Sequence, residues 1–284
     1  MGETTGGSSL PAEVREHYAS GYEAQRVTRG DVGGAEMLRT QELVLRYLPP
    51  PPAIVLDIGG GPGVYATWLA RLGYTVHLID ALPLHVEFAQ RASDQQPDAP
   101  LASVVLGDAR SLAFADACAD AVLLFGPLYH LTERDDRIQA LREACRVLRP
   151  GGIALAVGIS RYATTLEGIF RGFFDDPAFV AITERDVLDG QHRNPTDHPD
   201  YFTTTYFYHP SELRVEMEAA GLYHEVTLAV EGPAWLAQQV EERWEDAAFR
   251  ERILAAVRRV EREPSLLGVS AHLLAVGRRN PGER

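Results

Sequence analysis

The chain has 284 residues, of which 45% are hydrophobic, so it is long enough to bury the core of one large domain or of a domain with a lid. Its 27 basic residues, all of them arginines, are outnumbered by 40 acidic residues, and the net charge of −13 disfavours nucleic acid as a partner. Two cysteines are too few for a disulfide framework, no apolar run reaches the length of a membrane span, and the polar N-terminus lacks the pattern of a secretory signal. We therefore predict a cytoplasmic protein that does not bind membranes.

Two amphipathic helices are predicted ahead of the first strand, over residues 10–26 and 34–48, and the prolines at 49–52 end them. Residues 1–52 are thus expected to form an N-terminal helical cap. Tyr18 and Tyr22 are four residues apart, so they share one face of the first helix.

An apolar strand over residues 55–58 runs directly into a glycine turn that opens an amphipathic helix. Its glycines allow a sharp turn and let a ligand lie against bare amides where the helix begins: Gly59, Gly60, Gly61 and Gly63. Gly61, Gly63 and Ala66 also satisfy a loose dinucleotide fingerprint, so the glycines alone do not identify the ligand. Asp57 favours S-adenosylmethionine (SAM), because a carboxylate there would repel a pyrophosphate and attract the ammonium and sulfonium groups of SAM.

Two further strands, predicted over 74–80 and 101–106, have a carboxylate at or just after their C-terminal end, followed by a small residue: Asp80 and Ala81, and Asp108 and Ala109. A carboxylate about 20 residues past the glycine turn can accept hydrogen bonds from the ribose hydroxyls of an adenosine, and the next one is placed to accept from the adenine amino group. Each acid taken alone is also explained as a helix cap or a solvated strand end. Together with the turn, the three acids favour a cationic nucleoside without phosphate.

Strands continue to alternate with helices along the chain. Helical stretches are predicted over 83–92, 134–148 and 211–220, and further strands over 121–125, 153–160, 223–230 and 269–277. This alternation predicts an α/β fold with a doubly wound, mostly parallel, seven-stranded Rossmann-like sheet, an antiparallel edge strand and a helical lid. The ligand should lie at the C-terminal ends of the strands, where the three acids are.

Several motifs are shared with one known family: Asp57-x-Gly59-x-Gly61-x-Gly63, Asp80, Gly107-Asp108-Ala109, and Leu148-Arg149-Pro150-Gly151-Gly152. On these motifs, residues 53–160 resemble the SAM-binding core of class I SAM-dependent methyltransferases of the bacterial small-molecule type. Weaker similarity extends towards the C-terminus over 209–213 and 218–222. The resemblance implies SAM as the cofactor and methyl transfer to an O, N or C nucleophile, and it names no acceptor.

The resemblance also implies roles for the cofactor residues. Asp57 and the four glycines would hold the methionine end, Asp80 the ribose, and Asp108 and Ala109 the adenine, with Phe125 lining the cleft beside the adenosine. Ala81 would be a further cofactor-binding residue.

Three catalytic candidates follow from the same resemblance. His130 would face the transferring methyl group as a base, and a structural histidine that caps the next helix is the equal alternative. Tyr18 and Tyr22 would lie near the sulfonium or the acceptor, and a plain hydrophobic face is the alternative. Arg26, Arg29 and Arg39 are placed to meet the SAM carboxylate, without a choice among them.

Two segments exceed a minimal methyltransferase. Residues 161–208 are rich in aromatics and are predicted to be a helical insert or lid, while 209–284 complete the core and carry a helical insert at 234–263. Packing alone explains both, and the functional alternative is that the first segment caps the cleft and shapes the acceptor pocket. The segment also carries a candidate metal cluster without a recognised ligand spacing, so we predict no metal: His192, Asp197, His198 and Asp200.

The sequence therefore predicts a SAM-dependent methyltransferase acting on a small, partly aromatic molecule, and it leaves a homodimer open. The alternatives are a nucleotide-dependent oxidoreductase on a similar fold and a SAM-binding sensor that does not turn over. A tRNA or protein methyltransferase is less favoured because of the acidic balance.

Overall fold

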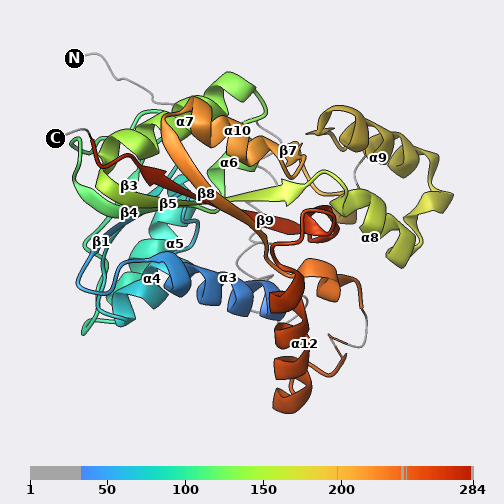
Figure 1. The fold of residues 1–284 in the computed structure, drawn as a ribbon, viewed down its shortest axis with the longest axis horizontal. Coiled ribbons are helices and arrows are strands. Elements are labelled where there is room, and N and C mark those ends of the chain that lie inside the picture. Colours follow the sequence, from blue (N-terminus) through green and yellow to red (C-terminus); the bar gives the residue numbers. More distant parts are fainter. Residues whose placement is uncertain (1–32, 197, 238–239, 241, 283–284) are drawn as a thin grey trace.

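The structure is a computed structural model that describes residues 33–196, 198–237, 240 and 242–282 (Figure 1). The helix predicted over 10–26, with Tyr18, Tyr22, Arg26 and Arg29, lies outside the described residues. No helix within the described ranges is both long enough and apolar enough to cross a membrane.

A central sheet organises the described chain. Its first five strands pair in parallel in the order β3-β2-β1-β4-β5. They are β1 (Ile54–Ile58), β2 (Thr75–Asp80), β3 (Ser103–Leu106), β4 (Ala119–Leu124) and β5 (Leu148–Ser160). The order reverses between β1 and β4, and this switch point is where open α/β sheets bind their ligands.

The long strand β5 joins the rest of the sheet. It pairs antiparallel with β9 (His272–Arg279), which pairs antiparallel with β8 (Leu222–Ala229). The doubly wound, mostly parallel sheet is confirmed, but the antiparallel strand β9 lies one place inside the edge, between β5 and β8.

Two short strands raise the sheet from the predicted seven strands to nine. They are β6 (Gln191–His192) and β7 (Thr205–Tyr208), and both come from the segment predicted as a helical insert. β7 pairs antiparallel with β6, and within β5 it pairs with the last two residues, Ile159 and Ser160.

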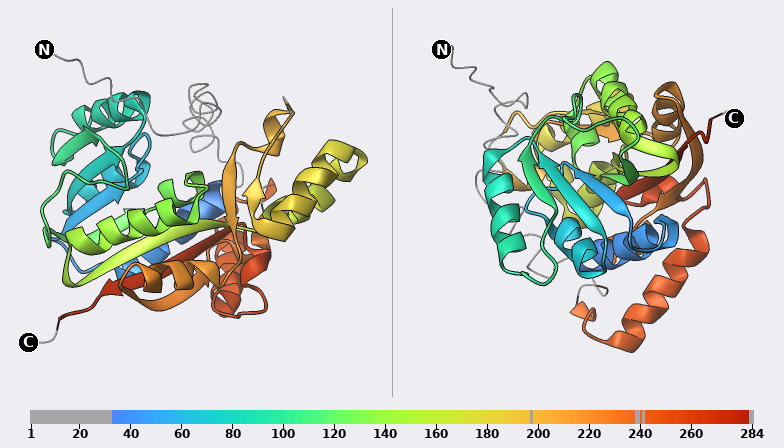
Figure 2. Two further views of the ribbon diagram at one scale, coloured as in Figure 1. Left: turned by 90° about the horizontal axis from the view of Figure 1, so that it is seen from above. Right: turned by 90° about the vertical axis from the view of Figure 1, so that its left-hand side faces the viewer.

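Helices cover both faces of the sheet (Figure 2). On one face, α7 (Arg134–Val147) and α10 (Glu212–Ala219) pack on Leu56 and other strand residues of the same parity. On the other face, α3 (Gly33–Tyr47), α4 (Val64–Arg71) and α5 (Pro83–Asp94) pack around Val55. Neighbouring residues of one strand face opposite layers, which explains why the core strands are apolar throughout.

The remaining helices lie at the C-terminal ends of the strands or outside the core (Figure 1). They are α6 (Pro127–His130), α8 (Ala163–Arg171), α9 (Pro177–Asp189), α12 (Ala247–Val260), and the 3₁₀ turns η1 (Phe173–Asp175), η2 (Pro199–Tyr201), η3 (Gly232–Leu236) and η4 (Leu267–Val269). Several aromatics of the 161–208 segment pack on one another, since Phe179, Ile182 and Tyr201 form a small buried cluster with Phe173 against it.

Candidate functional site

A cavity opens at the C-terminal ends of the strands, on the side that the sequence predicts. The predicted cofactor residues line it together with His130: Asp57, Gly59, Gly60, Gly61, Asp80, Ala81, Asp108, Ala109 and Phe125. Gly63 is the exception. It precedes α4 with φ of 88°, and a Cβ there would lie 3.2 Å from the Cβ of Ala89, so it permits the turn and the close packing of α4 on α5.

The glycine turn is shaped by the residues beneath it. Gly59 and Gly61 have φ of 70° and 55°, which a side chain would strain, and the amide of Gly59 donates to the carbonyl of Ile79 at 2.7 Å. At Gly60 a Cβ would lie 2.7 Å from Oδ2 of Asp57. Glycine at this position therefore keeps the Asp57 carboxylate clear.

Asp57 is the unusual acid of the site. Its side chain is buried, at 1% exposure, and no described residue donates a hydrogen bond to its Oδ2. Burial, and then the charge of Asp80, raise the pKa of the Asp57 carboxyl to about 7, against the opposing effect of a hydrogen bond from the Ala66 amide. A positively charged ligand would therefore stabilise the ionised form of this buried carboxylate.

Asp80, at the tip of β2, binds two neighbouring segments of the chain. Its Oδ2 accepts from the amide of Gly61 at 2.9 Å, and its Oδ1 accepts from the amide of Leu82 at 2.9 Å and lies 3.1 Å from Nδ1 of His85. The carboxylate thus fixes the glycine turn and the start of α5 together. Its two oxygens offer about four acceptor positions, so it can still accept from a ligand.

Asp108 is held by an arginine that sequence reasoning did not single out. Arg110 donates from Nε to Oδ1 at 3.0 Å and from a terminal nitrogen to Oδ2 at 2.7 Å. The same guanidinium reaches Asp136 on α7 at 2.6 Å, so this wall of the cavity is fixed by a chain of ion pairs.

Aromatic side chains surround the middle of the cavity. Phe125 meets Tyr65 edge to face with ring centroids 5.3 Å apart, and Tyr129 meets His130 at 4.7 Å. His130 is the last residue of α6, whereas the next helix, α7, begins after Glu133 without a side-chain cap. Both roles considered for His130, a base and a structural histidine, therefore stay predictions.

The far end of the cavity contains residues that the sequence analysis missed. Glu36, Met37 and Thr40 of α3, Val157 of β5 and His272 of β9 line it. These residues come from distant parts of the chain, and no local motif marks them.

Comparison with known proteins gives the family. A family model described as a methyltransferase domain matches residues 56–156. The UbiE ubiquinone/menaquinone biosynthesis C-methyltransferase of Chromobacterium violaceum is 32% identical over 183 residues, covering 61% of this chain and 70% of that protein. The chain belongs to the class I SAM-dependent methyltransferases.

Two further comparisons agree with this family. The malonyl-[acyl-carrier protein] O-methyltransferase of Methylococcus capsulatus is 34% identical over 135 residues, or 47% of this chain and 46% of that protein. A SAM-dependent methyltransferase structure from Methanosarcina mazei has the same fold, with a TM-score of 0.57, 17% identity, and coverage of 84% of this chain and 98% of that one. The chain spans about half the length of the first curated relatives that it matches.

SAM, the cofactor of class I methyltransferases, fits what the cavity presents. The buried Oδ2 of Asp57 without a described donor suits a ligand with cationic groups, and Gly60 leaves the space beside it open. No phosphate-binding cation lines this part of the described cavity, which suits a phosphate-free nucleoside.

One arginine lies elsewhere than the sequence predicts. Arg39 is fully buried and binds Glu261 at 2.5 Å, Glu42 at 2.8 Å and the carbonyl of Val230 at 3.1 Å. It ties α3 to the segment after α12 and does not line the cavity, so the prediction that it meets the SAM carboxylate is wrong.

The 161–208 segment contributes no described residue to the cavity wall, and its role as a lid stays a prediction. His192, from the candidate metal cluster there, is buried. Its Nδ1 lies 2.9 Å from Asp186 and its Nε2 lies 2.8 Å from the carbonyl of Tyr201, so it joins α9 to η2.

Proposed function

We propose that this protein transfers a methyl group from SAM to an O, N or C nucleophile of a small, partly aromatic molecule by direct displacement. The observation that carries the proposal is Asp57, a buried acid with an oxygen that no described residue satisfies, placed beside a glycine turn at the switch point of the sheet. When bound, SAM supplies an electrophilic methyl group, so the protein's main tasks are to orient the reactants and to exclude water.

The residues along the cavity suggest how it would hold the cofactor. We propose that Asp57 and the glycine turn bind the methionine end, Asp80 and Ala81 the ribose, and Asp108 and Ala109 the adenine. The tips of β1, β2 and β3 follow one another across the sheet, in the same order as the amino-acid tail, ribose and adenine follow one another along the ligand.

An aromatic acceptor is supported by the wall beyond the cofactor. Tyr65 and Tyr129 provide aromatic faces there, and Met37 and Val157 provide apolar ones. The named relatives include an O-methyltransferase and a C-methyltransferase, so both chemistries stay open. Those names support catalysis over the sensor and the oxidoreductase. The acidic composition supports a small acceptor over nucleic acid, while a homodimer and a cytoplasmic location stay predictions.

The test has two parts. Calorimetry with SAM and S-adenosylhomocysteine should show binding, which Asp57→Ala removes. Release of S-adenosylhomocysteine should then be followed across a panel of phenols, enols, amines, carboxylates and indoles. Binding without release from any acceptor would support the sensor, and a co-purified nicotinamide or flavin would support the oxidoreductase.

A further inference from the structure

The far end of the cavity is positioned to hold the methyl acceptor. If the cofactor spans the tips of β3, β2 and β1, as proposed above, the space towards β5 and β9 is left beyond its methionine end. His272 stands there at the start of β9, opposite Ile159 of β5, while Glu36 enters from α3.

His272 is held by a buried carboxylate. Its Nδ1 lies 2.5 Å from Oε1 of Glu231, whose side chain is 2% exposed. The other oxygen of Glu231 accepts from Ser270 Oγ at 2.9 Å and from the amide of His272 at 3.1 Å. The carboxylate is thus fixed from several sides and orients the imidazole, with Nδ1 assigned as the protonated nitrogen from this contact.

The carboxylates around His272 would stabilise the imidazolium that forms when Nε2 takes up a proton. Burial raises the pKa of a carboxyl such as Glu231, yet the charge and hydrogen bond of His272 hold the pKa of Glu231 below its usual value, so it stays ionised at neutral pH. A second carboxylate, Glu36, has its Oε1 4.0 Å from Nδ1 of His272. Two carboxylates therefore lie within 4.0 Å of Nδ1 of His272.

We propose that His272 is the general base of the methyl transfer, that Glu231 is its positioning residue, and that the acceptor is a weakly acidic hydroxyl, a phenol or an enol. In this step the acceptor O–H bond breaks, the proton passes to Nε2 of His272, and the electron pair stays on the acceptor as the nucleophile. The inference rests on the proposed function. It also moves the role of base from His130 of α6 to a residue at the start of β9.

A metal site would be the competing use of Glu36, Glu231 and His272, whose ligand atoms lie within 4.8 Å of one another. Two ligands of one tetrahedral zinc ion lie about 3.4 Å apart when each bond is about 2.1 Å. The 2.5 Å between Nδ1 and Oε1 is instead a hydrogen-bond distance. The geometry therefore favours the base.

The experiment follows the ionisation of 4-nitrophenol, whose phenolate absorbs visible light that the phenol does not. The probe is added to protein saturated with S-adenosylhomocysteine, at a pH where most of the free probe is protonated, and bound probe is counted by equilibrium dialysis. Wild type should bind it largely as phenolate. His272→Asn keeps an amide donor towards Glu231 but accepts no proton, so it should show at least about tenfold less phenolate per bound probe. Glu231→Gln should lie between them.

His224→Asn is the matched control, because His224 lies on β8, outside the cavity wall, and should behave as wild type. Equal phenolate in wild type and His272→Asn, or no binding of the probe to wild type, would overturn the proposal. So would a phenolate signal that a chelator abolishes, which would assign the cluster to a metal. Failure of the proposed function is distinguishable, since it appears in separate measurements, either as absent binding of SAM in the calorimetry or as no release of S-adenosylhomocysteine with any acceptor.

Discussion

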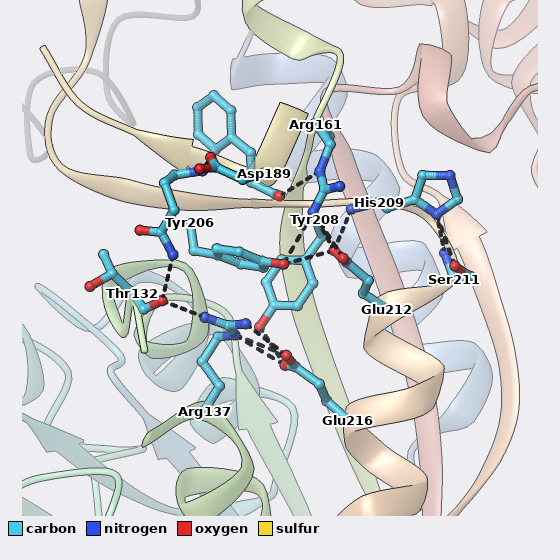
Figure 3. A network of polar contacts seen from close by, with 12 residues as sticks. Thr132, Arg137, Arg161, Asp189, Tyr206, Tyr208, His209, Ser211, Glu212 and Glu216 are labelled. Atoms are coloured by element: carbon cyan, nitrogen blue, oxygen red, sulfur yellow. Dashed lines mark hydrogen bonds and ion pairs between the residues drawn. The ribbon is translucent and has the colours of Figure 1, made fainter. Parts of the chain in front are cut away.

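Two acids are buried to nearly the same extent on opposite sides of this fold, and they differ in what surrounds them. Glu216, 2% exposed, accepts from Arg137 at 2.8 to 3.1 Å and from the hydroxyl of Tyr208 at 3.1 Å (Figure 3). Arg137 donates onward to the carbonyls of Leu131 and Thr132. Asp57, 1% exposed, has an oxygen that no described residue satisfies.

The difference in hydrogen bonding distinguishes an acid that stabilises the fold from an acid that can bind a ligand. A buried charge loses its hydration, and a complete set of hydrogen bonds and an opposite charge offset that loss. Around Glu216 the set is complete, and the network joins α7 to α10 and β7. At Asp57 the hydrogen bond from the Ala66 amide offsets only part of the loss, so the pKa of the Asp57 carboxyl is raised to about 7 and the position is ready for a cationic ligand.

The largest expected effect comes from breaking the complete network. Arg137→Met leaves the charge of Glu216 buried without its partner, and we expect a loss of about 3–5 kcal/mol in the free energy of unfolding, measured with urea. The double variant Arg137→Met with Glu216→Leu should recover most of this loss. A loss below about 1 kcal/mol in the single variant would show that water already reaches Glu216.

The second prediction concerns the pH dependence of stability that Asp57 causes. The native pKa of Asp57 is raised, so the native state keeps a proton that the unfolded state releases, and stability falls as pH rises from about 4 to about 7. The loss is about 4 kcal/mol at most. Asp57→Asn should remove this part of the pH dependence in SAM-free protein. Parallel stability profiles of wild type and variant between these pH values would contradict the account.

The third prediction concerns Asp80, whose oxygens accept some hydrogen bonds and can accept more. Asp80→Ala removes a charged acceptor for the ribose together with the bonds to Gly61 and Leu82, so SAM affinity should fall at least about tenfold. Calorimetry provides the measurement. Asp94→Ala, at the exposed end of α5, is the control and should bind SAM as wild type does. Equal affinity in Asp80→Ala would place the ribose elsewhere.

The smallest effect is expected where a charge pair is exposed. Glu87 and Arg91 pair on α5 with side chains 54% and 63% exposed. Water already solvates both groups, so Glu87→Gln should change the free energy of unfolding by less than about 0.5 kcal/mol. A larger change in urea unfolding would show that burial does not determine how much an ion pair contributes to the free energy of unfolding.

Much of the site could be predicted because its signals are local. The glycine turn and the acids at the strand tips each follow from a few neighbouring residues, and the parallel sheet brings those tips to one edge. Arg39 was misplaced because its partner, Glu261, is 222 residues away, and nothing near Arg39 shows that the pair forms.

The residues at the far end of the cavity could not be predicted either, because they are also far apart in the sequence. Glu36, Glu231 and His272 belong to α3, to the turn after β8 and to β9, and only the pairing of β9 with β5 and β8 brings them together. Strands β6 and β7 are too short to show a period in the sequence, so their pairing is set by the end of β5.

The central claim is that the cationic end of SAM binds at Asp57, and proton release on binding tests it most directly. At pH 7 the free Asp57 is about half protonated, so a cationic ligand should expel about half a proton. Calorimetry of SAM binding in buffers with different ionisation enthalpies measures that number. We predict release of about half a proton in wild type and none in Asp57→Asn, whereas equal proton release in both, or none in wild type, would contradict the account.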